Sequence, residues 1–189
     1  SSINNMVGSI NKVDGNMIGN ERGIVMLNSD EVVKLVQHGL AIADRISGKN
    51  PNYENDNSFF EDYMISGCMA EFAVFKYLGS DEFYDWGVGM QQKRLPDLDP
   101  MGYNAGVKGI WDEHHLPIVL DKDEGQVIVW RKQMGDVPYH LEVLGFVPAE
   151  EMRLERYWKN PRKWQMTSLD GLIECESPDH LFMLLEEYA

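Results

Sequence analysis

A change of hydrophobic pattern at Gly79 constrains the fold of this 189-residue chain more than any other feature. Before Gly79, apolar residues recur at helical spacing over residues 30–47 and 58–78. After it, turn signals separate short segments with strand-like composition, namely residues 94–98, 105–111, 117–120, 126–132 and 139–147. Helices are predicted again from residue 148 and over residues 179–187. This order of elements predicts an α/β (or α+β) fold in which helices flank a mixed central β-sheet.

The length of the chain suits one compact domain with a substantial core. Residues 1–28 are rich in Gly, Asn and Ser and are predicted to form an irregular arm, with a short hairpin around residues 13–16. The domain proper is then expected over residues 29–189, with Ser29 as the N-cap of the first long helix. The two cysteines, Cys68 and Cys175, lie far apart and lack metal-ligand spacing, which indicates neither a disulfide framework nor a zinc site.

The net charge of −14 argues against a protein whose whole surface binds nucleic acid. The sequence has no run of about 18 apolar residues that would cross a membrane, and its start lacks the features of a signal peptide. We therefore expect a cytoplasmic protein with no membrane association.

Basic residues are concentrated late in the chain, where several are interleaved with aromatic residues. Such a segment either contacts phosphates and stacks on bases or is a solvated helix face over buried aromatics. The candidate nucleic-acid-binding residues are Arg131, Lys132, Arg156, Lys159, Arg162 and Lys163.

Three charged residues stand out in otherwise apolar or strand-like surroundings. Glu71 lies in an apolar stretch of the second helix, and a carboxylate there must be paired, bound to a metal or able to reach water. Asp97 follows Pro96 at the start of a predicted strand, and Lys108 lies in the next strand. Successive strand residues face opposite ways, so a core-facing Val107 would direct Lys108 toward a cleft.

These residues and their neighbours resemble the PD-(D/E)xK nucleases, in particular the small endonuclease-like proteins of phages and resolvase-type families. The resemblance rests on Gly67-Cys68-Met69-Ala70-Glu71, on Pro96-Asp97, on Val107-Lys108 and on the hydrophobic strands that follow, and it covers roughly residues 58–152. It implies a restriction-endonuclease-like fold and a Mg²⁺- or Mn²⁺-dependent endonuclease, phage-encoded, that acts on DNA.

The resemblance also implies roles for individual residues. Glu71 and Asp97 would be the carboxylate ligands of the metal, and the Val107 carbonyl would complete its coordination. Lys108 would position the attacking water or stabilise developing negative charge. The chain departs from the family at Gly106, where an Asp or Glu is expected two residues before the lysine. Asp99, two residues after Asp97, is the candidate replacement if the strand continues that far.

The departure at Gly106 leaves the function open between three classes. The first is an active metal-dependent endonuclease that hydrolyses DNA phosphodiester bonds. The second is a catalytically inactive relative that binds nucleic acid, another protein or a second copy of itself, and the acidic charge suits a basic partner. The third is a metal-dependent hydrolase of a small phosphorylated substrate, which only the width of the pocket distinguishes from the first.

Overall fold

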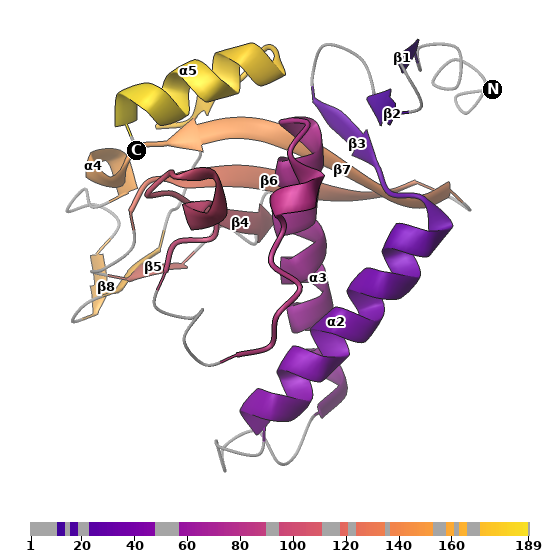
Figure 1. Cartoon of the computed structure of the whole chain (residues 1–189). Coiled ribbons are helices and arrows are strands. Elements are labelled where there is room, and N and C mark those ends of the chain that lie inside the picture. The colour runs from indigo at the N-terminus through magenta and orange to yellow at the C-terminus, as the bar shows by residue number, and fades with distance from the viewer. Residues whose placement is uncertain are drawn as a thin grey trace.

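A computed structural model of the chain describes residues 11–13, 16–18, 23–47, 57–89, 95–110, 118–120, 124–134, 137–152, 158–160, 163–165 and 171–188. Helices and a mixed sheet combine in an α/β fold (Figure 1), which confirms the predicted class. In the part of the chain covered by these ranges, no helix is both long and apolar enough to span a membrane.

Within the described residues, four helices lie where the sequence pattern predicts them. They are α2 (Ser29–Ser47), α3 (Asn57–Tyr77), the short α4 (Ala149–Met152) and α5 (Pro178–Tyr188). Two single turns of 3₁₀-helix, η2 (Asp81–Phe83) and η4 (Asp99–Met101), lie between α3 and the sheet strands.

The start of α2 differs by one residue from the prediction. Asn28, not Ser29, caps the helix: its Oδ1 accepts the Glu31 N–H at 2.8 Å, and Glu31 Oε1 accepts the Asn28 N–H at 3.0 Å. This reciprocal pair is a capping box, in which Asn serves as well as Ser because both offer a short side-chain acceptor.

The central sheet has the strand order β1-β2-β3-β7-β6-β4. The strand β10 also pairs with β7, next to β3 and on the edge opposite β6. Its strands are β1 (Asn11–Val13), β2 (Asn16–Ile18), β3 (Ile24–Met26), β4 (Gly106–Ile110), β6 (Gln126–Met134), β7 (Val137–Val147) and β10 (Ile173–Glu174). The β4–β6 pair is parallel and the other pairs are antiparallel, so the sheet is mixed. A second small sheet contains β5 (Ile118–Leu120), β9 (Lys163–Gln165) and β8 (Trp158–Asn160), in that order.

Two of the expectations for local structure are wrong. Residues 95–98, the described part of the strand expected over 94–98, form a bend and a turn that lead into η4, because Pro100 lacks the N–H that would continue a ladder. Residues 24–26, assigned to an irregular arm, form β3 and pair with β7. The hairpin around residues 13–16 is confirmed, with β1 and β2 paired and Val13 opposite Asn16.

The larger core lies between the sheet and the helices α2, α3 and α5. Val107, Val127, Leu141 and Val143 face it from the sheet, and α3 contributes the nearly continuous buried run from Cys68 to Phe75, with Glu71 the exception. The opposite face of the sheet carries a smaller cluster formed by Ile110, Ile128, Val147 and Met152. Because Val107 and Ile110 belong to different clusters, β4 alternates between the two faces as a strand must.

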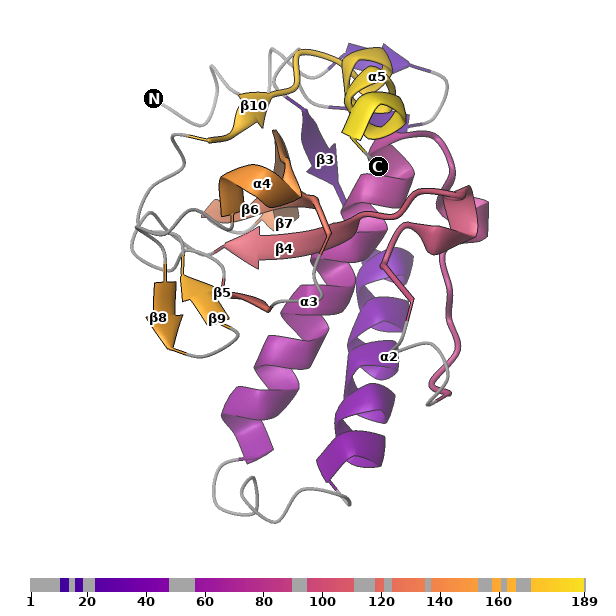
Figure 2. The ribbon, with the colours of Figure 1, turned by 90° about the vertical axis from the view of Figure 1, so that its left-hand side faces the viewer.

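Helices α2 and α3 lie side by side, and α3 crosses the larger core (Figure 2). Their close approach requires Gly39, since a Cβ there would come within 2.7 Å of Ile65 Cα. At the other end of the pair, Lys76 Nζ donates to Glu31 Oε1 at 2.7 Å and to the Met26 carbonyl at 3.0 Å. These contacts hold the start of α2 against the end of α3, and thereby fix the face of α2 that lines the candidate site.

Candidate functional site

Glu71 is the one charged residue within the buried run of α3. Its sequence neighbours Ala70 and Phe72 are 3% and 4% exposed, whereas Glu71 itself keeps partial exposure. The carboxyl group lines a pocket of about 300 Å³ that also contains Asp85, Asp97 and Asp99. Of the three states expected from the sequence (paired, bound to a metal or able to reach water), partial exposure at a pocket corresponds to the last.

Asp97 is held in place by a turn and by the edge of the sheet. The Leu98 N–H donates to the Ala105 carbonyl at 3.0 Å, which brings the turn against the start of β4. Asp97 Oδ2 accepts the Val107 N–H at 2.7 Å, a short charge-assisted bond. Although Asp97 is not in a strand, these two bonds place its carboxyl group beside β4, where the strand prediction would also have put it.

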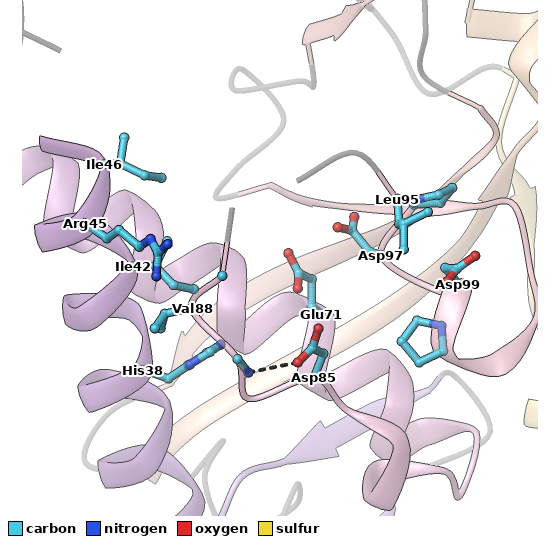
Figure 3. A pocket seen from close by; sticks show the side chains of 14 residues that line it. His38, Ile42, Arg45, Ile46, Glu71, Asp85, Val88, Leu95, Asp97 and Asp99 are labelled. Atoms are coloured by element: carbon cyan, nitrogen blue, oxygen red, sulfur yellow. Dashed lines mark hydrogen bonds between the residues drawn. The ribbon is translucent and has the colours of Figure 1, made fainter. Parts of the chain in front are cut away.

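The carboxyl groups of Glu71 and Asp97 point toward each other across the floor of the pocket (Figure 3). The pKa of Glu71 is raised well above its ordinary value, first by burial and then by the negative charge of Asp97. Lys108 lowers the pKa of Glu71 and Asp85 raises it further, so both charges also act at this point. Glu71, Asp97 and Asp85 therefore line one pocket, and Lys108 acts on it through its charge from β4.

The negative charge of this cluster also acts on neighbouring groups. Burial first and Glu71 second raise the pKa of Cys68 to about 12, and the same two causes raise the pKa of Tyr84. Cys68 is therefore a buried thiol at neutral pH. The Lys108 charge is the one opposing contribution to the pKa of Glu71, so burial and the neighbouring acids favour the protonated form of Glu71 as long as no cation offsets their negative charge.

Lys108 and Val107 lie in β4, as predicted, with Val107 in the core and Lys108 partly exposed. The Gly106 N–H donates to the Gly125 carbonyl, so the backbone groups of Gly106 face β6. In a parallel pair, the next residue directs both of its backbone groups to the other side. The Val107 carbonyl therefore lies on the same side of β4 as Asp97, which is where its assignment as a metal ligand requires it.

Gly106 has no room for the acidic side chain that the resemblance leads one to expect. A Cβ at this position would lie 2.3 Å from Gln126 Oε1 and 2.9 Å from Gln126 Cδ. Gln126 is paired with Gly106 across the two strands, is 4% exposed and donates from Nε2 to the Glu124 carbonyl at 3.0 Å. A glutamine side chain thus occupies the space that a carboxylate at residue 106 would use.

Asp99 does not replace that acid in the way expected. The argument that it shares a strand face with Asp97 fails, because Asp99 begins the 3₁₀ turn η4. It nevertheless lines the same pocket, at an exposed position on its rim.

The opposite wall of the pocket comes from α2, which was not predicted from the sequence. His38, Ile42, Arg45 and Ile46 follow one face of that helix at spacings of four, three and one residues (Figure 3). His38 is 8% exposed, with its ring 5.7 Å from that of Tyr84 and 5.4 Å from that of Trp86. Burial lowers the pKa of His38, so its imidazole is neutral near pH 7. The helical spacing of His38 and Arg45 was visible in the sequence, but nothing in the sequence indicated that this face of α2 would line a pocket with residues of α3.

The donor set suits a magnesium or manganese ion bound largely by water and substrate. Among the residues whose placement is described, no three His, Cys, Asp or Glu side chains are grouped so as to hold a metal together. Mg²⁺ is commonly bound through one or two carboxylates, with waters and substrate phosphates completing an octahedral shell. Two adjacent carboxyl groups with excess negative charge fit that mode of binding, and they do not fit a closed structural site.

The side chains of the candidate nucleic-acid-binding residues lie outside the part of the chain that the structure describes. Backbone positions are described for Arg131 and Lys132 in β6, Lys159 in β8 and Lys163 in β9, but their side chains lie outside the described part, as do Arg156 and Arg162 altogether. Their assignment remains a prediction.

No protein-family model, no curated protein and no solved structure matches this chain. The chemistry of the site is therefore inferred from its own side chains.

Proposed function

We propose that this chain is a metal-dependent phosphodiesterase of the restriction-endonuclease-like class that hydrolyses DNA. One observation supports this proposal above the others: the carboxyl groups of Glu71 and Asp97 point toward each other in one pocket, within electrostatic reach of Lys108. Residues far apart in sequence meet there, in the combination that phosphodiester hydrolysis needs.

Each residue has a chemical part in this reaction. Glu71 and Asp97 would hold a Mg²⁺ or Mn²⁺ ion together with the Val107 carbonyl, and the ion would supply charge neutralisation and a water of lowered pKa. In the hydrolysis, the oxygen of a water would form a bond to phosphorus while the bond from phosphorus to the leaving sugar oxygen breaks, and a proton from the water would pass to the leaving oxygen, giving a phosphate monoester and a free hydroxyl. Lys108 places a positive charge near the phosphoryl oxygens, where negative charge accumulates.

The activity assay follows cleavage of single-stranded, duplex and branched DNA with Mg²⁺ or Mn²⁺. Wild-type protein is expected to cleave at least one of these substrates, and Asp97→Asn or Lys108→Met to lower the rate by about 100-fold or more, the usual loss when one electrostatic contribution is removed. Asp99→Asn is the matched control on the rim and should retain most of the activity. A wild type that cleaves none of the substrates with either metal would exclude the proposal.

A second candidate function is favoured by the Gln126 side chain that fills the place of the missing acid. In that case the chain is a catalytically inactive relative that binds nucleic acid or a protein. Loss of DNA or partner binding in Glu71→Gln, without cleavage by the wild type, would support this candidate, whereas cleavage abolished by Asp97→Asn would exclude it.

A further inference from the structure

The pocket has two chemically different walls. Its floor and one side carry the carboxyl groups of Glu71, Asp85 and Asp97, while the α2 wall presents Arg45 between two apolar side chains, Ile42 and Ile46. A ligand that fills the pocket therefore needs a charged part for the floor and for Arg45, and a less polar part for the isoleucines.

The size of the pocket limits what can enter. At about 300 Å³ it is at the lower end of the range for small-molecule sites, roughly 300–1,000 Å³. Glu71 and Asp85 lie between α2 on one side and residues 95–100, which carry Asp97, on the other (Figure 3), so a phosphodiester reaches the acids by entering between these walls. A strand with its base unpaired needs less room there than a strand that carries its complement.

The distribution of positive charge points the same way. Duplex-binding surfaces depend on many Lys and Arg contacts to phosphates. Of the cations whose side chains are described, Lys34 lies 3.9 Å from the centroid of the Trp86 ring and Lys76 is paired with Glu31 at 2.7 Å. Lys108 acts on the acids from β4, and Arg45 is the described cation that lines the pocket itself. With two such cations and a net charge of −14, affinity has to come from apolar contact with an unpaired base more than from phosphates.

We propose that the α2 wall holds one unpaired nucleotide next to the phosphodiester that is cleaved, so that the substrate is a single strand or the unpaired part of a branched DNA. Arg45 binds the phosphate on the side opposite Glu71 and Asp97, and Ile42 and Ile46 contact the base or sugar. This inference rests on the proposed function, whose substrate class it narrows, and it assigns substrate contacts to α2 residues.

Binding is measured by fluorescence anisotropy of a short labelled oligonucleotide, single-stranded or annealed to its complement, with Ca²⁺ in place of Mg²⁺. The single strand is expected to bind at least tenfold more tightly than the duplex, and Arg45→Ala to weaken that binding about tenfold or more, as for the loss of a charged hydrogen bond. Lys34→Ala is the matched control, since it removes a positive charge from the same helix outside this pocket. It should change the affinity less than twofold.

A steric test uses Ile46→Trp, which narrows the pocket, with Val33→Trp as the control on the exposed side of α2, where Val33 is 56% exposed. Only Ile46→Trp should abolish binding, provided that circular dichroism shows both variants folded. Equal affinity for single strand and duplex, or equal losses in Arg45→Ala and Lys34→Ala, would overturn the inference. Cleavage of both DNA forms at similar rates would overturn this inference while leaving the proposed function intact. Arg45-dependent binding of the single strand without any cleavage would overturn the proposed function and leave the binding of an unpaired nucleotide at the α2 wall intact.

Discussion

Replacing Glu71 by Gln should stabilise the metal-free protein, and the gain should depend on pH in a defined way. Burial and the Asp97 charge raise the pKa of Glu71 well above the ordinary value of 4.5. The stability associated with a protonated Glu71 is fully present below about pH 4.5 and is lost as the pH rises through the folded-state pKa. Glutamine at this position does not ionise, so the variant does not suffer that loss.

The size of the effect follows from linkage. Between pH 4.5 and the folded-state pKa, the difference in unfolding free energy between Glu71→Gln and wild type should grow by up to about 1.4 kcal/mol per pH unit. For a chain of this length, that corresponds to a relative gain in Tm of about 3–6 °C per pH unit. Above the folded-state pKa, the difference should level off.

Thermal unfolding in EDTA, followed by circular dichroism at one-unit steps of pH, measures this difference directly. Glu176→Gln is the control, since it removes an exposed carboxylate outside the pocket, and its Tm difference from wild type should stay within about 1 °C, as for a neutral surface substitution. A Tm difference for Glu71→Gln that does not change with pH would refute the reasoning, because it would show that Glu71 ionises as readily in the folded as in the unfolded chain.

Three other outcomes are expected. Gly106→Asp should destabilise the protein by about 1–3 kcal/mol, since its Cβ overlaps Gln126, and by less in a Gln126→Ala background, as measured by denaturant unfolding; equal losses in the two backgrounds would contradict this. Gly39→Ala should lower the unfolding free energy by about 1–3 kcal/mol, because its Cβ would lie 2.7 Å from Ile65 Cα, and an unchanged melting curve would show that α2 moves freely. The ring resonances of His38 should titrate with a pKa below 6.5, since burial disfavours the imidazolium, and its contribution to stability should decline as the pH falls below 6.5; a pKa at or above 6.5 would contradict this.

Periodicity and turn chemistry predicted most of the elements of this fold. The α3 range and the strands β4, β6 and β7 follow the sequence pattern closely, because their apolar residues face a core on one or both sides. The pattern could not show that residues 24–26 join the sheet, since a three-residue strand at the side of β7 has too few side chains to display a period.

The site was predictable in its residues but not in its construction. Glu71, Asp97 and Lys108 were identified because charged residues in apolar or strand-like surroundings need partners; Glu71 and Asp97 line one pocket, and the Lys108 charge acts on Glu71. The turn that presents Asp97 depends on a side-chain bond to the Val107 N–H, which no local pattern encodes. The α2 wall depends on helix packing over a long sequence separation, and His38 and Arg45 were therefore missed.

The β-bulge in the sheet is a further feature that the sequence did not indicate. The register between β6 and β7 shifts between Ile128 and Val129, which leaves Leu144 as an extra residue in β7. The bulge reverses the alternation of β7, so that Val143 and Phe146 both face the larger core. A strict period of two would have put them on opposite faces.

The central claim is that Glu71 and Asp97 together bind a divalent cation, and calorimetric titration with Mn²⁺ tests it most directly. Wild-type protein should bind one Mn²⁺ with release of a proton, because the raised pKa of Glu71 favours a protonated carboxyl group that the cation must ionise. Glu71→Gln and Asp97→Asn should each weaken binding at least tenfold, while Asp99→Asn, on the rim of the same pocket, should bind nearly as well as wild type. Binding that is absent in the wild type, or that is unchanged in both Glu71→Gln and Asp97→Asn, would contradict the claim.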